Sequence, residues 1–129
     1  MVRAAGPSPG CGDTATTQTD MNICVGSRFK QADVQLKAVY RAVLKKHHSD
    51  FEFTRNLQAA QRAWLAWRDA EMKAIYPDRE PGYYGSVLPM CWSGQLAELT
   101  RDRTKQLQKW LDGVAEGEVC GGSFPSAER

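Results

Sequence analysis

Three long segments of the chain repeat apolar residues at steps of three and four positions, and no other feature restricts the fold as strongly. The segments cover about residues 17–47, 51–76 and 92–112. This spacing places the apolar side chains on one face of an α-helix, and no segment shows the alternation that is typical of a strand. Three such helices in a row bury their apolar faces against one another. The sequence therefore predicts an all-α fold, an antiparallel three-helix bundle.

Each predicted helix has a defined inward face. In the first helix this face consists of Met21, Cys24, Val25, Phe29, Ala32, Leu36, Val39, Tyr40, Val43 and Leu44. In the second it consists of Phe53, Leu57, Ala60, Gln61, Trp64, Leu65, Arg68, Met72 and Ile75. In the third it consists of Leu96, Leu99, Thr100, Arg103, Leu107, Trp110 and Leu111. The second and third faces contain arginines, and a charged group that faces a core needs a partner.

The ends of the first predicted helix carry residues that are typical of capping positions. Thr17 can satisfy free backbone N–H groups at its start. The adjacent His47 and His48 lie at its end, where cations interact favourably with the helix dipole. Because two adjacent histidines point to different sides and lack a third ligand, we predict no metal site there. Gly26-Ser27 is a point at which this helix can bend or divide.

The segments outside the helices suggest the domain boundaries. Residues 1–12 are rich in proline, glycine and serine, so we expect a flexible N-terminal segment. Residues 13–112 form the predicted helical domain, and the glycine-rich residues 113–129 form a predicted irregular tail. Between the second and third helices, the stretch YPDREPGYYGS (76–86) contains two prolines and two glycines and predicts an irregular loop.

Charge and cysteine spacing exclude several classes of protein. The net charge of +2 is spread along the chain, whereas a nucleic-acid-binding protein needs a concentrated basic surface. No apolar run is long enough to span a membrane. The four cysteines include no Cys-x-x-Cys pair, which favours two disulfides and an oxidising compartment over a metal site. The alternative is four reduced thiols in a cytosolic adaptor, since the first residues contain no apolar signal-peptide segment.

No group of residues in the sequence forms a recognisable catalytic site. The histidines are accounted for as capping residues, and no serine lies at a helical spacing from either of them. Asp78 and Glu80 are paired carboxylates, but they lie in the loop and would have to be buried to act as acid and base. We therefore expect no enzymatic activity, and we predict no cofactor and no metal.

Polar residues on the second and third helices are interpreted as structural. Trp64, Arg68 and Met72 recur every four residues on one helical face, as core-facing residues do. An interhelix pair, either Arg68–Asp33 or Arg103–Asp69, would fix the register of the helices. We therefore assign structural roles to Trp64, Arg68, Asp69 and Arg103.

The loop at residues 78–88 is the predicted binding surface, and the alternative is that Tyr83 and Tyr84 simply cover the open end of the bundle. Tyrosine provides a large contact area at low entropic cost, and glycines on either side let the loop adapt. The residues with side chains suited to hydrogen bonding with a partner are Arg79, Tyr83, Tyr84 and Ser86.

Three stretches, TQTDMNICVGSRFKQADVQLKAVY, LQAAQRAWLAWRDAEM and YGSVLPMCWSGQLAELTRDRTKQL, resemble the LprI-like lysozyme-inhibitor family of small secreted bacterial proteins. The resemblance runs from about Cys11 to Leu107. Its most specific motifs are Asn22-x-Cys24, Ala32-Asp33 with Leu36 and Tyr40, Gln61-x-Ala63-Trp64 with Arg68-Asp69, and Leu99-Thr100 with Arg103. It implies a periplasmic or secreted helical domain with no cofactor and a protein partner. For some members it implies inhibition of lysozyme.

The cysteines depart from the family pattern. Met72 and Gln95 occupy two positions where the family usually has cysteine, whereas this chain has Cys91 and Cys120 elsewhere. One predicted pairing is Cys24–Cys91, at one end of the bundle, with Cys11–Cys120 tethering the tail. The alternative is Cys11–Cys24 with Cys91–Cys120, which requires the tail to return along a whole helix.

The resulting expectation is a secreted or periplasmic, non-catalytic binding protein. The leading specific hypothesis is a lysozyme inhibitor that blocks the glycan cleft, although a net charge of +2 gives no global electrostatic attraction to a basic lysozyme. The alternative is a structural or interaction module of the envelope, or a secreted effector that binds another protein. The sequence makes no prediction of the oligomeric state.

Overall fold

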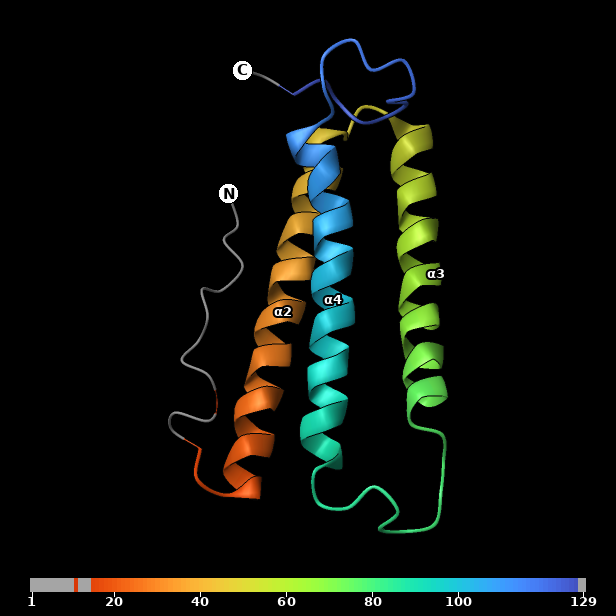
Figure 1. The fold of residues 1–129 in the computed structure, drawn as a ribbon. Coiled ribbons are helices and arrows are strands. Elements are labelled where there is room, and N and C mark those ends of the chain that lie inside the picture. Colours follow the sequence, from red (N-terminus) through yellow and green to blue (C-terminus); the bar gives the residue numbers. More distant parts are fainter. Residues whose placement is uncertain (1–10, 12–14, 128–129) are drawn as a thin grey trace.

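The computed structural model describes Cys11 and residues 15–127, and three long helices form an antiparallel bundle in this part of the chain (Figure 1). They are α2 (Gln18–Lys46), α3 (Phe51–Ile75) and α4 (Leu88–Asp112). Within the described residues the backbone forms no strand, and one isolated bridge joins Val114 to Ser126. The prediction of an all-α three-helix bundle is confirmed. Apart from Cys11, the predicted flexible segment 1–12 lies outside the described residues.

A side-chain hydrogen bond caps the start of α2 and the start of α3. The Thr17 side chain accepts a hydrogen bond of 3.0 Å from the Asp20 amide at the start of α2. Asp50 caps α3 in the same way, through the Phe53 amide at 3.0 Å. The start of α4 was predicted wrongly at residue 92, because the helix begins at Leu88 with a proline in its first turn. Proline is favoured there because backbone N–H groups in the first turn of a helix have no acceptor within the helix, so the lack of an N–H group costs no hydrogen bond.

Gly26-Ser27 does not interrupt α2, which is a single helix of 29 residues. A Cβ atom on Gly26 would lie 3.9 Å from Ser93 Oγ on α4, and one on Gly94 would lie 3.7 Å from a Val25 methyl group. The two glycines therefore face the contact between α2 and α4. We infer that they are suited to close packing of these helices and do not mark a bend.

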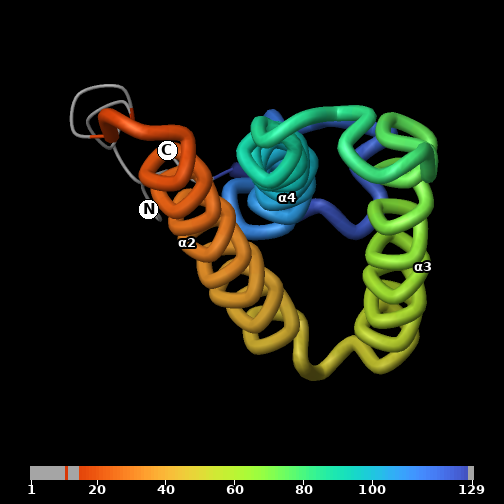
Figure 2. The backbone as a smooth tube through the Cα atoms, turned by 90° about the horizontal axis from the view of Figure 1, so that it is seen from below, coloured from red at the N-terminus to blue at the C-terminus, as the bar shows by residue number. Residues whose placement is uncertain are grey.

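The three helices are not equally close to one another. Helices α2 and α4 lie side by side, whereas α3 stands further away and is connected mainly through its side chains (Figure 2). The buried core cluster consists of Leu36, Val39, Val43, Leu57 and Leu107. On α3 the buried residues are Leu57, Gln61 and Met72. Ala60, Leu65 and Ile75 were predicted to face the core but are exposed. For Ala60 and Leu65 the reason is that α3 buries only a narrow stripe, whereas Ile75 is the last residue of the helix.

The tail folds over the end of the bundle where α2 meets α3 (Figure 1). Trp110 near the end of α4 packs between two rings, with centroid distances of 5.7 Å to Phe53 and 4.8 Å to Phe124. Its indole Nε1 donates a hydrogen bond of 2.9 Å to Ser123 Oγ. The predicted tether through Cys120 is wrong, since Cys120 is a free, exposed thiol. Phe124 and its neighbours attach the tail.

The disulfide in the structure joins Cys11 to Cys24, with a Cα–Cα distance of 5.8 Å. Cys91 and Cys120 are free, so the predicted pairs Cys24–Cys91 and Cys11–Cys120 are wrong. Cys24 is not available to Cys91 because it is bonded to Cys11. The pair Cys11–Cys120 fails for a topological reason. In an up–down–up bundle the first and third helices are parallel, so a residue before α2 and a residue after α4 lie at opposite ends. The alternative pairing is right for Cys11–Cys24 and wrong for Cys91–Cys120.

We expect two free thiols in the native protein and four after full reduction. Cys120 is exposed and is expected to react quickly with a water-soluble thiol reagent, whereas the half-buried Cys91 reacts more slowly. A Cys120→Ser variant should lose the fast phase only. A folded protein with no reactive thiol before reduction, even in denaturant, would contradict this pairing.

Candidate functional site

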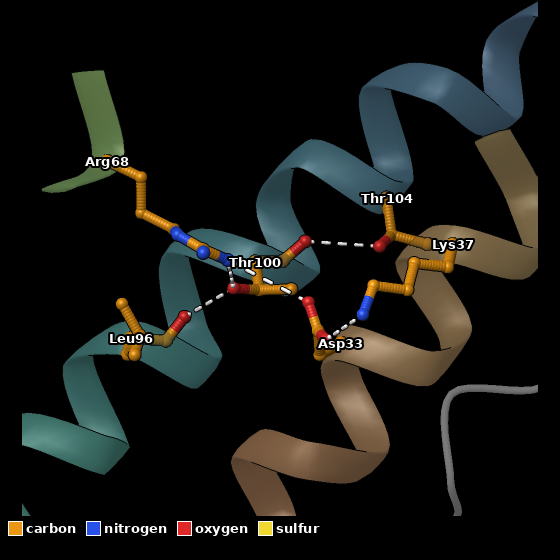
Figure 3. Close-up of polar contacts among 6 residues, drawn as sticks. All are labelled: Asp33, Lys37, Arg68, Leu96, Thr100 and Thr104. Carbon is orange, nitrogen blue, oxygen red and sulfur yellow. Dashed lines mark hydrogen bonds and ion pairs between the residues drawn. The ribbon is translucent and has the colours of Figure 1, made fainter. Parts of the chain in front are cut away.

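One polar contact joins all three helices (Figure 3). Arg68 on α3 extends toward α4, where its Nη1 donates a hydrogen bond of 3.1 Å to Thr100 Oγ1. The same nitrogen lies 4.0 Å from Oδ1 of Asp33 on α2. The other carboxylate oxygen of Asp33 pairs with Lys37 at 2.9 Å. Of the two interhelix pairs that the sequence suggested, Arg68–Asp33 is therefore present.

Thr100 is the fully buried centre of this contact, with an exposed fraction of 0%. Its hydroxyl accepts from Arg68 and donates to the Leu96 carbonyl at 2.7 Å, so its hydrogen-bonding capacity is used on both sides. The Arg68 guanidinium carbon lies 5.2 Å from the centroid of Trp64 and 5.8 Å from that of Phe29. The contact therefore combines a polar link with cation–π packing.

Arg103 on α4 makes a second polar contact with α3, but with an amide and not with Asp69. Its Nε donates to Gln61 Oε1 at 2.9 Å, and its Nη1 donates to Gln106 Oε1 at 3.0 Å. Asp69 is exposed. Arg103 is only 9% exposed, and burial lowers its pKa below the ordinary value of an arginine. Among the described residues its Nη2 has no hydrogen-bond partner, so two neutral amides hold a buried cation.

The segment between α3 and α4 lies at the end of the bundle opposite the tail (Figure 1). A turn in it is closed by the Gly85 amide, which donates to the Gly82 carbonyl at 3.0 Å. Both glycines have positive φ values, 82° and 75°, which other residues rarely adopt. Asn22 on α2 donates to the Ser86 carbonyl at 3.3 Å. The loop is therefore ordered by its own turn and by a contact with α2.

Tyr84 supports the loop from within. Its hydroxyl donates a hydrogen bond of 2.6 Å to the Pro77 carbonyl, and its ring meets that of Tyr76 edge-on at 5.6 Å. The Tyr76 ring also lies 5.9 Å from Trp92 on α4. Burial raises the pKa of Tyr76 above its ordinary value of 10.0, and the nearby Cys91 adds to this shift. The Tyr84 hydroxyl, predicted to contact a partner, is already used inside the loop.

Tyr83 and Arg79 form the exposed part of the loop. Tyr83 is 66% exposed, and its ring packs edge-on against Tyr84 with a centroid distance of 4.9 Å. The Arg79 guanidinium carbon lies 5.9 Å from the Tyr83 centroid. Ser86 is also exposed. The loop therefore brings Arg79 and Tyr83 together on the surface, with Tyr84 behind them as support.

Sequence reasoning missed the residues that position this loop, namely Asn22, Tyr76, Pro77 and Trp92. A signal was available for two of them. Tyr76 ends the second helix and Trp92 lies in the first turns of the third, so a connection that makes these helices neighbours must bring the two rings close. Asn22 lies in the motif Asn22-x-Cys24, but its distance of 64 positions from Ser86 gave no local signal.

A metal centre is not indicated by the geometry. No group of three or more His, Cys, Asp or Glu side chains in the described part of the chain is arranged to hold a metal ion. His47 and His48 instead contact the backbone oxygens of Trp110 and Lys45, each at 3.0 Å. None of the described helices has the length and apolar character needed to cross a membrane.

Comparison with known proteins identifies the family. The model of the family described as lysozyme inhibitor LprI matches residues 11–107. An uncharacterised protein of Rhizobium meliloti (strain 1021) is 34% identical over 124 residues, which cover 88% of this chain and 86% of that protein. No solved structure matches the chain. The family match includes α2, α3, the loop between α3 and α4, and α4 as far as Leu107. The chain belongs to the LprI lysozyme-inhibitor family.

Proposed function

We propose that this protein acts outside the cytoplasm by binding another protein without catalysis, and that its partner is a lysozyme whose glycan cleft it blocks. Family membership supports the class of partner. The disulfide supports an oxidising compartment, periplasmic or extracellular, because such bonds are rare in the cytosol. The observation that carries the proposal is the ordered loop with Tyr83 and Arg79 at its surface.

The shape of the loop suits insertion into a cleft. Tyr83 projects with most of its side chain exposed, while its ring is held from behind by Tyr84 and flanked by Arg79. A rigid aromatic residue loses little entropy on binding, and interface energy is concentrated in such residues. Most glycoside-cleaving enzymes place two carboxyl groups across the scissile bond. The Arg79 guanidinium and the Tyr83 hydroxyl are donors suited to those carboxyl groups.

The charge of the loop is also compatible with a basic enzyme. Asp78 and Glu80 flank Arg79, so the loop carries two acidic residues and one basic residue although the whole chain has a net charge of +2. The acidic side chains would face the basic surface around a cleft while the arginine enters it. Attraction of this kind acts over about 8 Å in physiological salt, so local charge matters more than the net charge.

A lysozyme turbidity assay on cell-wall suspension tests the proposal. Titrating the oxidised protein against several lysozymes is expected to give stoichiometric inhibition of at least one of them. Tyr83→Ala and Arg79→Ala should each weaken this inhibition by about tenfold or more, which corresponds to a lost contact of about 1.4 kcal/mol. Val119→Ala is the matched control, because Val119 is exposed in the tail, at the other end of the bundle.

Two results would contradict different parts of the proposal. A folded, disulfide-bonded protein that inhibits no lysozyme would exclude the lysozyme as partner and favour an envelope interaction module. Inhibition that survives both loop substitutions would keep the lysozyme but exclude the loop as the contact surface.

A further inference from the structure

We propose that the groove between α3 and the tail end of α4 binds a partner segment that presents an apolar side chain next to lysine or arginine. The groove has a volume of about 460 Å³. Its lining includes Asp50, Glu52, Phe53, Leu57, Ala60 and Trp110. It lies at the end of the bundle opposite the loop, so this inference does not depend on the lysozyme proposal.

The apolar residues that line the groove are suited to contact with an apolar side chain. The lining includes Leu57, which is 3% exposed, and the half-buried rings of Phe53 and Trp110, which pack against each other with a centroid distance of 5.7 Å. Ala60 lines the groove and is exposed, although the sequence predicted that it faces the core. Its side chain is a single methyl group and therefore occupies little of the groove. An apolar group that enters this space removes apolar area from water.

The charges at the groove favour a basic partner. Asp50 and Glu52 are both acidic and both exposed, and they are the charged residues of the lining. Two lysines at this end of the bundle make contacts outside the groove. Lys46 Nζ donates to the Leu111 carbonyl at 2.8 Å, and Lys109 Nζ lies 4.6 Å from the Phe124 centroid. A lysine or arginine beside the apolar side chain would find two carboxylates near it.

The groove is also well separated from the loop. A helix of 29 residues such as α2 is roughly 40 Å long at 1.5 Å per residue. A partner that fills the groove can therefore leave Arg79 and Tyr83 free. The chain has two contact surfaces that can be tested separately.

The test is an NMR titration of the ¹⁵N-labelled full chain with two peptides, acetyl-Arg-Arg-Trp-Arg-Arg-amide and acetyl-Glu-Glu-Trp-Glu-Glu-amide. We expect the basic peptide to bind at least about tenfold more tightly than the acidic one. Its shifts should concentrate on the Trp110 indole N–H and on the amides near Ala60. Equal binding of the two peptides, or shifts concentrated on residues 76–88, would overturn the proposal.

Two pairs of variants sharpen the result. Ala60→Arg fills the groove and should weaken binding of the basic peptide by about tenfold or more, whereas Ala59→Arg changes an exposed neighbour outside the lining and should not. Glu52→Gln should weaken binding by a smaller factor, and Glu98→Gln on the exposed surface of α4 is its control. Equal effects within either pair would mean that binding is not located in the groove.

Discussion

Met72→Ala is expected to lower the free energy of unfolding by about 2–5 kcal/mol, the range for a large buried aliphatic side chain truncated in a core. Met72 is 1% exposed, although it belongs to the helix that stands furthest from the others. Its burial means that side chains from other parts of the fold enclose it. A cavity left by the truncation is costly because close-packed neighbours relax only in part. The large expected effect thus tests whether α3 is an integral part of the fold.

Ile75→Ala is the matched control on the same helix. Ile75 is 37% exposed, so its truncation removes less buried area and is expected to cost about 1 kcal/mol or less. Urea unfolding measures both variants, and an unchanged m-value would show that the comparison concerns stability alone. Similar small losses for the two variants would contradict a docked α3. They would place most of the stability in the α2–α4 pair.

The position of α3 is the part of the fold that periodicity could not predict. Apolar spacing identifies which face of a helix turns inward, and on α3 it correctly gave Leu57, Gln61 and Met72 as buried. It does not say how much of that face another helix covers. Leu65 lies at the margin of the stripe and is exposed. Ile75 lies on the same face as the buried Leu57, five turns further on, but it is the last residue of α3 and is also exposed.

The predictions of the disulfide pairing and of the tail attachment failed for a different reason. Both depend on which ends of the chain lie close together. The prediction treated Cys11 and Cys120 as flexible arms, although the predicted topology already placed them at opposite ends of the bundle. Applying that topology to the cysteines would have favoured Cys11–Cys24, which the structure contains. For the tail, the available signal was Phe124, an aromatic residue in a polar segment that had a partner in Trp110.

Within the candidate site, residue types were easier to predict than their roles. The sequence identified the tyrosine pair and Arg79 as the main features of the loop. It could not separate Tyr83 from Tyr84, because adjacent identical residues differ only in where the backbone turns them. The turn at Gly82 and Gly85 directs Tyr84 toward Pro77 and leaves Tyr83 at the surface.

The buried pair Arg103–Gln61 gives the second large expected effect, which is a coupling between two substitutions. Arg103→Met removes the donor to Gln61 Oε1 and leaves a buried amide oxygen unpaired, at a cost of about 1–3 kcal/mol. Gln61→Leu leaves a buried charge with one fewer acceptor, and a loss of about 3 kcal/mol or more is expected. In the double variant neither polar group is left behind, so its stability should be close to that of the unsubstituted protein or above it.

Urea unfolding of the four proteins gives the coupling energy directly, because effects of independent sites add and those of partners do not. Burial lowers the pKa of Arg103, and its Nη2 has no hydrogen-bond partner among residues 15–127 and Cys11. Both observations indicate that the guanidinium is costly in this core. A double variant as stable as the unsubstituted protein would show that the pair contributes register and not stability. Strictly additive losses would mean instead that the guanidinium is still solvated, and that Gln61 is not the partner that compensates its charge.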